Sequence, residues 1–111
     1  MEIKVEQREN HTAVVALNGR FDLLSAVAVK QRLVDVVGEG YYRLVVDLQD
    51  VGFIDSSGLG ALISGLKAAR SAGGDLRIAR PEKQTRYVLE VSTLDRILRP
   101  FATIEEALTG Y

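Results

Sequence analysis

The sequence has no cysteine, no tryptophan and only two prolines among its 111 residues. The absence of cysteine excludes a disulfide framework, a thiolate metal site and a catalytic thiol. Long hydrophobic runs are also absent: the longest aliphatic run covers residues 13–17, whereas a membrane-spanning helix needs about 20 apolar residues. Acidic residues lie near the amino terminus, where a signal peptide would carry basic ones. We therefore expect a cytoplasmic protein without membrane insertion.

The sequence also lacks an excess of charge of either sign. The 14 lysines and arginines are balanced by 15 aspartates and glutamates, which gives a formal net charge of −1. Binding to nucleic acid requires a basic surface that displaces counterions, so we expect no nucleic-acid partner. Apolar residues (47%) and charged residues (26%) occur at the ordinary levels of a folded protein. The length fits a single domain that spans residues 1–111.

The spacing of apolar residues changes along the chain between the period of strands and that of helices. Strands are expected at residues 3–7, 13–17, 44–48 and 76–79, with apolar character continuing from Val51 to Ile54, and helices at residues 26–37, 57–69, 87–91 and 105–108. The polar turn at residues 9–12 predicts an antiparallel hairpin. Apolar residues between Leu94 and Phe101 suggest a short edge strand that ends at Pro100.

The connection between the strands at residues 44–48 and 76–79, from Gln49 to Gly74, contains a whole predicted helix. A connection of that length permits a right-handed crossover, which makes the two strands parallel. The sequence therefore predicts an α/β fold, with one mixed, mostly parallel sheet of four to five strands packed with about four helices. Asp22 or Ser25 is expected to cap the first helix.

The segment Asp55-Ser56-Ser57-Gly58-Leu59-Gly60 joins the end of a predicted central strand to the start of a helix. Ligands and partners commonly meet an open α/β sheet at the carboxyl ends of its strands. A helix amino terminus there offers unpaired N–H groups and a partial positive charge. A purely structural interpretation also fits the residue types: Ser57 would cap the helix, Asp55 would complete the turn, and the glycines would allow close packing.

Two chemical interpretations of this segment fail. A serine hydrolase elbow needs glycine two residues before the nucleophile, where this chain has Asp55. A phosphate-binding loop needs a lysine directly after its second glycine, where this chain has Ala61 after Gly60. No catalytic base, metal-ligand set or cofactor loop accompanies Ser57. We therefore expect neither enzymatic activity, nor a metal, nor a cofactor.

A third interpretation treats Ser57 as a phosphate acceptor. The helix dipole would favour the product by about 0.3–1 kcal/mol at an exposed site. The added charge of about −1.5 to −2 would, at a docked interface, cost several kcal/mol. No charged residue occurs from Ser56 to Leu66, and small residues (Gly60, Ala61, Ser64, Gly65) are expected opposite the apolar stripe of that helix. Such a face permits close approach of another chain, unless the helix is buried on both sides.

With these residues identified, the chain resembles the stand-alone anti-sigma factor antagonists of the STAS domain family. Three parts of the sequence carry the resemblance: Leu17-Asn18-Gly19-Arg20-Phe21-Asp22; Val46-Asp47-Leu48 with Phe53-Ile54-Asp55-Ser56-Ser57-Gly58-Leu59-Gly60; and Leu94-Asp95-Arg96-Ile97 with Glu105-Glu106-Ala107-Leu108. The resemblance covers nearly the whole chain and implies the STAS fold.

The resemblance also implies a mechanism of partner switching. An anti-sigma factor that is itself an ATP-dependent serine kinase would phosphorylate Ser57. The unmodified protein would bind that kinase and free a sigma factor, and a PP2C-type phosphatase would reverse the modification. Asp22 would lie beside the acceptor on the partner surface, and Asp55 would orient the acceptor hydroxyl. The expected partner-binding residues are Asp22, Asp55, Ser56, Ser57, Gly58, Leu59, Gly60, Ala61 and Ser64.

An alternative from another functional class is a STAS subunit of a stress-signalling or lipid-transport assembly that is never phosphorylated. The sequence leaves the oligomeric state open. Thr93 stands where many relatives have glycine, and a β-branched residue there predicts a helix end that is not left-handed. His11, Arg70, Arg77 and Arg80 are expected to be ordinary solvated residues.

Overall fold

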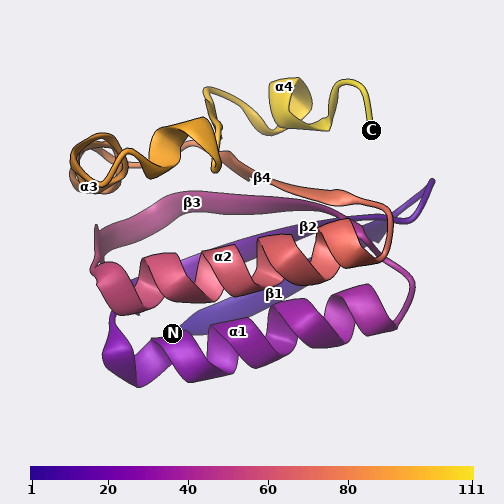
Figure 1. Ribbon diagram of the computed structural model, residues 1–111, viewed down its shortest axis with the longest axis horizontal. Helices are drawn as coiled ribbons and strands as arrows, with labels where there is room; N and C mark the ends of the chain where they lie inside the picture. Colours follow the sequence, from indigo (N-terminus) through magenta and orange to yellow (C-terminus); the bar gives the residue numbers. More distant parts are fainter.

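Five strands form one sheet in the order β1-β2-β3-β4-β5 in the computed structural model, which describes residues 1–111 (Figure 1). The strands are β1 (Glu2–Arg8), β2 (Thr12–Phe21), β3 (Arg43–Ile54), β4 (Asp75–Ala79) and β5 (Pro100–Phe101). β1 and β2 are antiparallel, and every other neighbouring pair is parallel. The predicted hairpin and the mostly parallel sheet are both confirmed.

The hairpin turns where both Asn10 and His11 adopt positive φ angles, 59° and 57°. Two consecutive residues in that region produce a tight turn whose twist matches that of the flanking strands. The prediction that His11 is merely solvated is incomplete. Its Nδ1 lies 2.9 Å from the carbonyl oxygen of Gly40, and its ring stacks on Tyr42 with centroids 4.8 Å apart.

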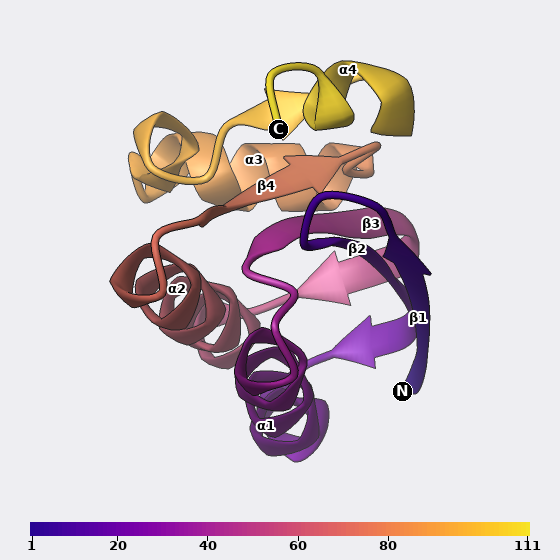
Figure 2. The ribbon, with the colours of Figure 1, turned by 90° about the vertical axis from the view of Figure 1, so that its right-hand side faces the viewer.

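The helices cover both faces of the sheet unequally (Figure 2). They are α1 (Leu23–Gly38), α2 (Ser56–Ser71), α3 (Lys83–Val91) and α4 (Ile104–Leu108), with a short 3₁₀ helix, η1 (Leu94–Arg96), after α3. α1 and α2 pack side by side on one face, over the larger cluster of buried apolar residues. α4 covers the other face over a smaller cluster built on Val14, Val45 and Ala79. Alternate residues of β2 and β3 therefore face two different cores.

The carboxyl-terminal residues form hydrogen bonds with β3 and β4. The Tyr111 hydroxyl donates a hydrogen bond to the carbonyl oxygen of Leu44 at 2.8 Å. Burial raises the pKa of the Tyr111 phenol above its ordinary value, so the hydroxyl remains a donor. Arg77 donates to the carbonyl oxygens of Ala107 and Thr109 at 2.8 and 2.7 Å. These bonds hold α4 against the sheet.

Two expectations about charged residues are wrong. Arg77 holds the carboxyl-terminal segment rather than standing free in solvent, and Arg80 pairs with the buried carboxylate of Asp47. The hydrogen bond to Asp47 is the main reason why the pKa of Arg80 is raised above its ordinary value. Arg80 bends the chain after β4 with a φ of 54°, which brings its side chain back over β3.

The segment after α3 also differs from expectation. The predicted edge strand is largely a turn and the 3₁₀ helix η1, and only Pro100 and Phe101 pair with β4. The turn buries Leu98 completely in the larger core. Thr93 adopts a left-handed conformation with φ 58° and ψ 16°, so the expectation for this helix end is wrong. The chain makes the sharp turn that the core requires, although its residue there is β-branched.

Replacing Thr93 by glycine should raise the free energy of unfolding by about 0.5–1 kcal/mol, because glycine avoids the steric cost of the left-handed conformation. Thr109 is a matched control with a φ of −61°. Thr109→Gly should be destabilising. Urea unfolding of both variants tests the pair, and a destabilised Thr93→Gly would contradict the role assigned to backbone strain.

Candidate functional site

The amino termini of α1 and α2 lie side by side at the carboxyl ends of β2 and β3 (Figure 1). An aspartate caps each helix. Asp22 accepts a hydrogen bond from the Leu24 N–H at 3.1 Å, and Ser25 completes the capping box by accepting from the Asp22 N–H. Asp55 accepts from the N–H groups of Ser57 and Gly58 at 2.9 and 3.1 Å. Both carboxylates therefore satisfy backbone donors that would otherwise lack partners.

Ser57 is not the capping residue of α2. It occupies the second position of the helix, is partly exposed, and its hydroxyl makes no hydrogen bond within the protein. The Asp55 carboxylate contacts backbone N–H groups rather than the Ser57 hydroxyl. The structural interpretation assigned the cap to the wrong residue, and the hydroxyl of Ser57 is free for chemistry.

Gly58 allows the start of α2 to touch the end of β2. A Cβ atom at this position would lie 2.6 Å from the carbonyl oxygen of Phe21 and 2.7 Å from Cγ1 of Ile54. The Asp55 N–H donates to that same Phe21 oxygen at 3.3 Å. This contact sets the distance between the two helix termini. A larger residue would force the helix away from the sheet.

Three residues expected on the partner surface are buried. Gly58 is enclosed by Phe21 and Ile54, and Leu59 and Ala61 are 5% and 2% exposed. Gly58 and Leu59 therefore offer a partner little surface, whereas Ala61 lines a groove between α1 and α2, so its contact with a partner stays a prediction. Ser56 and Gly60 are exposed, and Ser64 is partly exposed. Only part of the small-residue face is thus open to another molecule.

A shallow groove of about 320 Å³ separates α1 from α2, and Ser57 lines it. We call it the α1–α2 groove. Its rims carry Leu23, Val27, Lys30, Ser57, Gly60 and Ser64, and Ala26 and Ala61 lie between them. Leu23 and Val27 are 68% and 73% exposed. Ser57 therefore lies beside apolar side chains of α1 that no other part of the protein covers.

The contribution of α1 was missed from the sequence. The apolar spacing over residues 26–37 predicts a core stripe of Ala26, Val29, Leu33, Val36 and Val37, of which the first four are buried. Leu23 and Val27 form a second apolar row outside that stripe, and Leu24 beside them is 91% exposed. Apolar residues beyond the core stripe of an amphipathic helix were the signal that could have revealed an interaction surface.

Gln84 of α3 fixes the end of β3 directly before the cap. β4 pairs with β3 only as far as Asp47, so the end of β3 lacks a neighbour on that side. The Gln84 side chain supplies one: its Nε2 donates to the Ile54 carbonyl at 2.9 Å, and its Oε1 accepts from the Ile54 N–H at 2.9 Å. Asp55, one residue later, is therefore attached to a strand end whose backbone polar groups are satisfied.

Removing the carboxylate in Asp55→Ala should lower the free energy of unfolding by about 1–2 kcal/mol, because two N–H groups lose their acceptor. Ser57→Ala should change it by less than about 0.5 kcal/mol, since the hydroxyl has no partner in the protein. Urea unfolding measures both values. Equal losses in the two variants would mean that Ser57 has a structural role after all.

Comparison with known proteins agrees with this geometry. The family model described as "STAS domain" matches residues 2–107. A Thermotoga neapolitana protein named as a homologue of an anti-sigma factor antagonist is 36% identical over 74 residues, which are 67% of this chain and 66% of that protein. The anti-sigma-F factor antagonist RsfB of Mycobacterium tuberculosis is 31% identical over 103 residues, 91% of this chain and 82% of RsfB.

Solved structures share the whole fold. An anti-sigma factor antagonist from Mycobacterium paratuberculosis superposes with a TM-score of 0.85 at 28% identity, covering 97% of this chain and 91% of that one. The antagonist SpoIIAA, solved in unphosphorylated and phosphorylated forms, gives TM-scores of 0.82 and 0.74 at 21% identity. Each comparison covers 96% of this chain, with 93% and 96% of the SpoIIAA chains.

The named relatives are antagonists, which act by binding rather than by catalysis, in agreement with the prediction that this protein is not an enzyme. No helix combines the length and the apolar character needed to cross a membrane. The match over residues 2–107 and the shared architecture establish that the chain belongs to the STAS domain family.

Proposed function

We propose that this protein is an anti-sigma factor antagonist that is switched by phosphorylation of Ser57. In its unmodified form it binds an anti-sigma factor that is a serine kinase, and so releases a sigma factor. Phosphorylation ends the complex, and a PP2C-type phosphatase restores binding. One observation carries the proposal: a serine hydroxyl without an internal partner lines a groove with exposed apolar side chains.

The position of Ser57 suits a kinase substrate. Asp55 already caps the helix, so a modified Ser57 need not break a hydrogen bond of the fold. A phosphate in the first turn of α2 interacts favourably with the helix dipole, by about 0.3–1 kcal/mol at an exposed site. Phosphorylation should therefore leave the fold intact.

The same phosphate strongly opposes docking. Lys30 is the single charged residue that lines the α1–α2 groove, so a partner that fits it covers a largely uncharged surface. A phosphate adds a charge of about −1.5 to −2 at the edge of that surface. Burying this charge without a matched cation costs several kcal/mol, which corresponds to roughly two to three decades in affinity.

The relatives support the proposal by their names. RsfB and the mycobacterial structure are named as anti-sigma factor antagonists, and SpoIIAA has been solved with and without phosphorylation. Carried over to this chain, these names support an anti-sigma factor as the partner, and we place that partner in the α1–α2 groove. The residues proposed to meet it are Ser56, Ser57, Gly60 and Ser64 on α2 with Leu23 and Val27 on α1. Asp22 and Asp55 hold the two helix starts in place.

Incubation with the cognate kinase and ATP should place one phosphate on Ser57, detected by mass spectrometry of peptides. Ser56 provides a matched control because it is the adjacent serine and is more exposed. Ser56→Ala should be labelled like the wild type, whereas Ser57→Ala should not. Ser57→Asp should lose kinase binding in a pull-down while its thermal unfolding stays nearly unchanged. Labelling of Ser57→Ala would place the phosphate on another residue and contradict the assignment, whereas no labelling at all would favour an unphosphorylated subunit of another assembly.

Gly60→Ala should separate stability from binding. No atom outside the helix lies within 4 Å of a Cβ built at Gly60, so alanine fits and should stabilise α2 by about 0.5–1 kcal/mol. The added methyl group on the groove should nevertheless weaken kinase binding about tenfold, measured by isothermal titration calorimetry. Ser71→Ala, at the far end of α2, is the control and should bind normally. If Gly60→Ala bound the kinase with the affinity of the wild type, the groove would not be part of the interface.

A further inference from the structure

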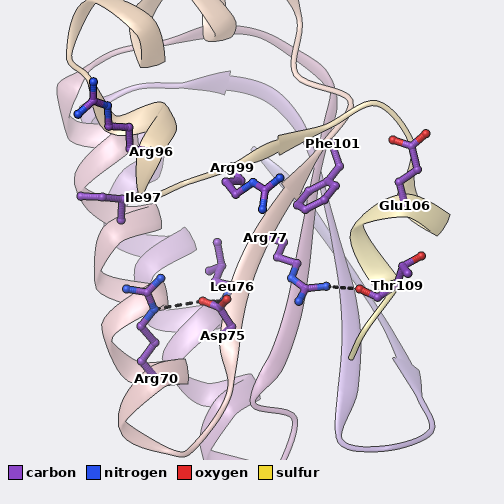
Figure 3. A pocket seen from close by; sticks show the side chains of 10 residues that line it. All are labelled: Arg70, Asp75, Leu76, Arg77, Arg96, Ile97, Arg99, Phe101, Glu106 and Thr109. Atoms are coloured by element: carbon purple, nitrogen blue, oxygen red, sulfur yellow. Dashed lines mark hydrogen bonds and ion pairs between the residues drawn. The ribbon is translucent and has the colours of Figure 1, made fainter.

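Four arginines gather around a cavity at the opposite end of α2 from Ser57. The cavity has a volume of about 340 Å³ and lies beside β4, between the carboxyl end of α2 and the segment from η1 to α4. Arg70, Arg77, Arg96 and Arg99 line it, although they come from three separate parts of the chain (Figure 3). Arg70 and Arg77 were expected to be ordinary solvated residues, and the fold brings them together.

The carboxylates of this cavity do not balance its guanidinium groups. Asp75 forms an ion pair with Arg70 at 3.2 Å, and its carboxylate accepts a hydrogen bond from the Leu76 N–H at 2.9 Å. Glu106 is the only other acidic residue of the lining and forms no ion pair. Arg77, Arg96 and Arg99 also form no ion pair, in a protein whose net charge is −1. Positive charge is therefore concentrated here against the overall balance of the molecule.

Arg77 is held rigidly in place. Its Nη1 donates to the carbonyl oxygens of Ala107 and Thr109, and its guanidinium lies 4.0 Å from the centroid of the Tyr111 ring. Carbonyl oxygens accept hydrogen bonds without neutralising the charge. The Arg77 guanidinium thus keeps its full charge and cannot easily turn into solvent.

Arg99 faces the same space from the other side. Its guanidinium lies 5.5 Å from the centroid of Phe101, and that of Arg77 lies 5.9 Å from the same ring. In Figure 3 the Arg99 side chain reaches toward Arg77, whereas the guanidinium of Arg96 turns outward at the rim. Both guanidinium groups therefore lie near the same ring and line the same cavity, where an anion would be attracted by both charges.

The geometry points to a binding site for the phosphoryl group of a small molecule. Guanidinium groups donate paired hydrogen bonds that match phosphate oxygens, and several of them together favour a doubly charged anion. Phe101 and Leu76 add an apolar wall beside the charges. The volume lies at the lower end of small-molecule sites, about 300–1,000 Å³, which suits a phosphate or a compact phosphate ester. This inference does not depend on the function proposed for Ser57.

Titration with inorganic phosphate, at ionic strength held constant with chloride, should cause saturable shifts in the amide NMR signals of Leu76, Arg77 and Thr109. A parallel titration with phenyl phosphate shows whether the site binds a phosphate ester better than free phosphate. Tighter binding of phenyl phosphate would indicate that an aromatic ester packs on the apolar wall, and equal binding would indicate recognition of the phosphoryl group alone. Shifts that never saturate, or that chloride reproduces, would overturn the site.

Single substitutions sharpen this test. Arg99→Gln should weaken phosphate binding about tenfold or more, and Arg96→Gln, at the rim, about twofold. Arg86→Gln is the matched control, because Arg86 is exposed on α3 outside the cavity. Arg99 makes no hydrogen bond in the protein, so Arg99→Gln should unfold thermally like the wild type. Equal weakening by Arg86→Gln and Arg99→Gln would mean that only general charge attracts the anion.

Discussion

The contact between Gly58 and the carbonyl oxygen of Phe21 determines how the two main helices meet. A side chain at position 58 could not fit above that oxygen, and the same oxygen accepts the Asp55 N–H. Because the contact is backbone against backbone, it leaves little freedom in the distance between the starts of α1 and α2. The α1–α2 groove depends on that distance. The glycine that was expected to touch a partner instead shapes the surface on which its neighbours stand.

Local sequence patterns predicted the elements well because their causes are local. Apolar periodicity defined the strands and helices, and the residues from Asp55 to Gly60 marked the corner before α2. The pattern did not distinguish the capping residue from the free hydroxyl, since serine and aspartate both suit a helix start. That distinction depends on which oxygen reaches the N–H groups of Ser57 and Gly58, and the structure assigns it to Asp55.

Features made by distant segments could not be predicted in this way. Whether Leu23 and Val27 are exposed depends on how α1 leans against α2, more than thirty residues later in the chain. The arginine cavity requires α2, β4 and the turn before β5 to meet at one edge of the sheet. Thr93 shows the converse case: a residue that disfavours the left-handed conformation adopts it, because burial of Leu98 outweighs the local preference.

The side-chain amide of Gln84 has a consequence for the way in which other proteins can attach. Where β3 extends beyond β4, its exposed edge would invite a foreign peptide to continue the sheet by strand addition. Gln84 occupies the Ile54 carbonyl and N–H that such a peptide would need, and α3 lies across the same edge. A partner that binds near the junction of β3 and α2 must therefore contact helix surfaces and side chains. Modification of a single hydroxyl can change such a surface.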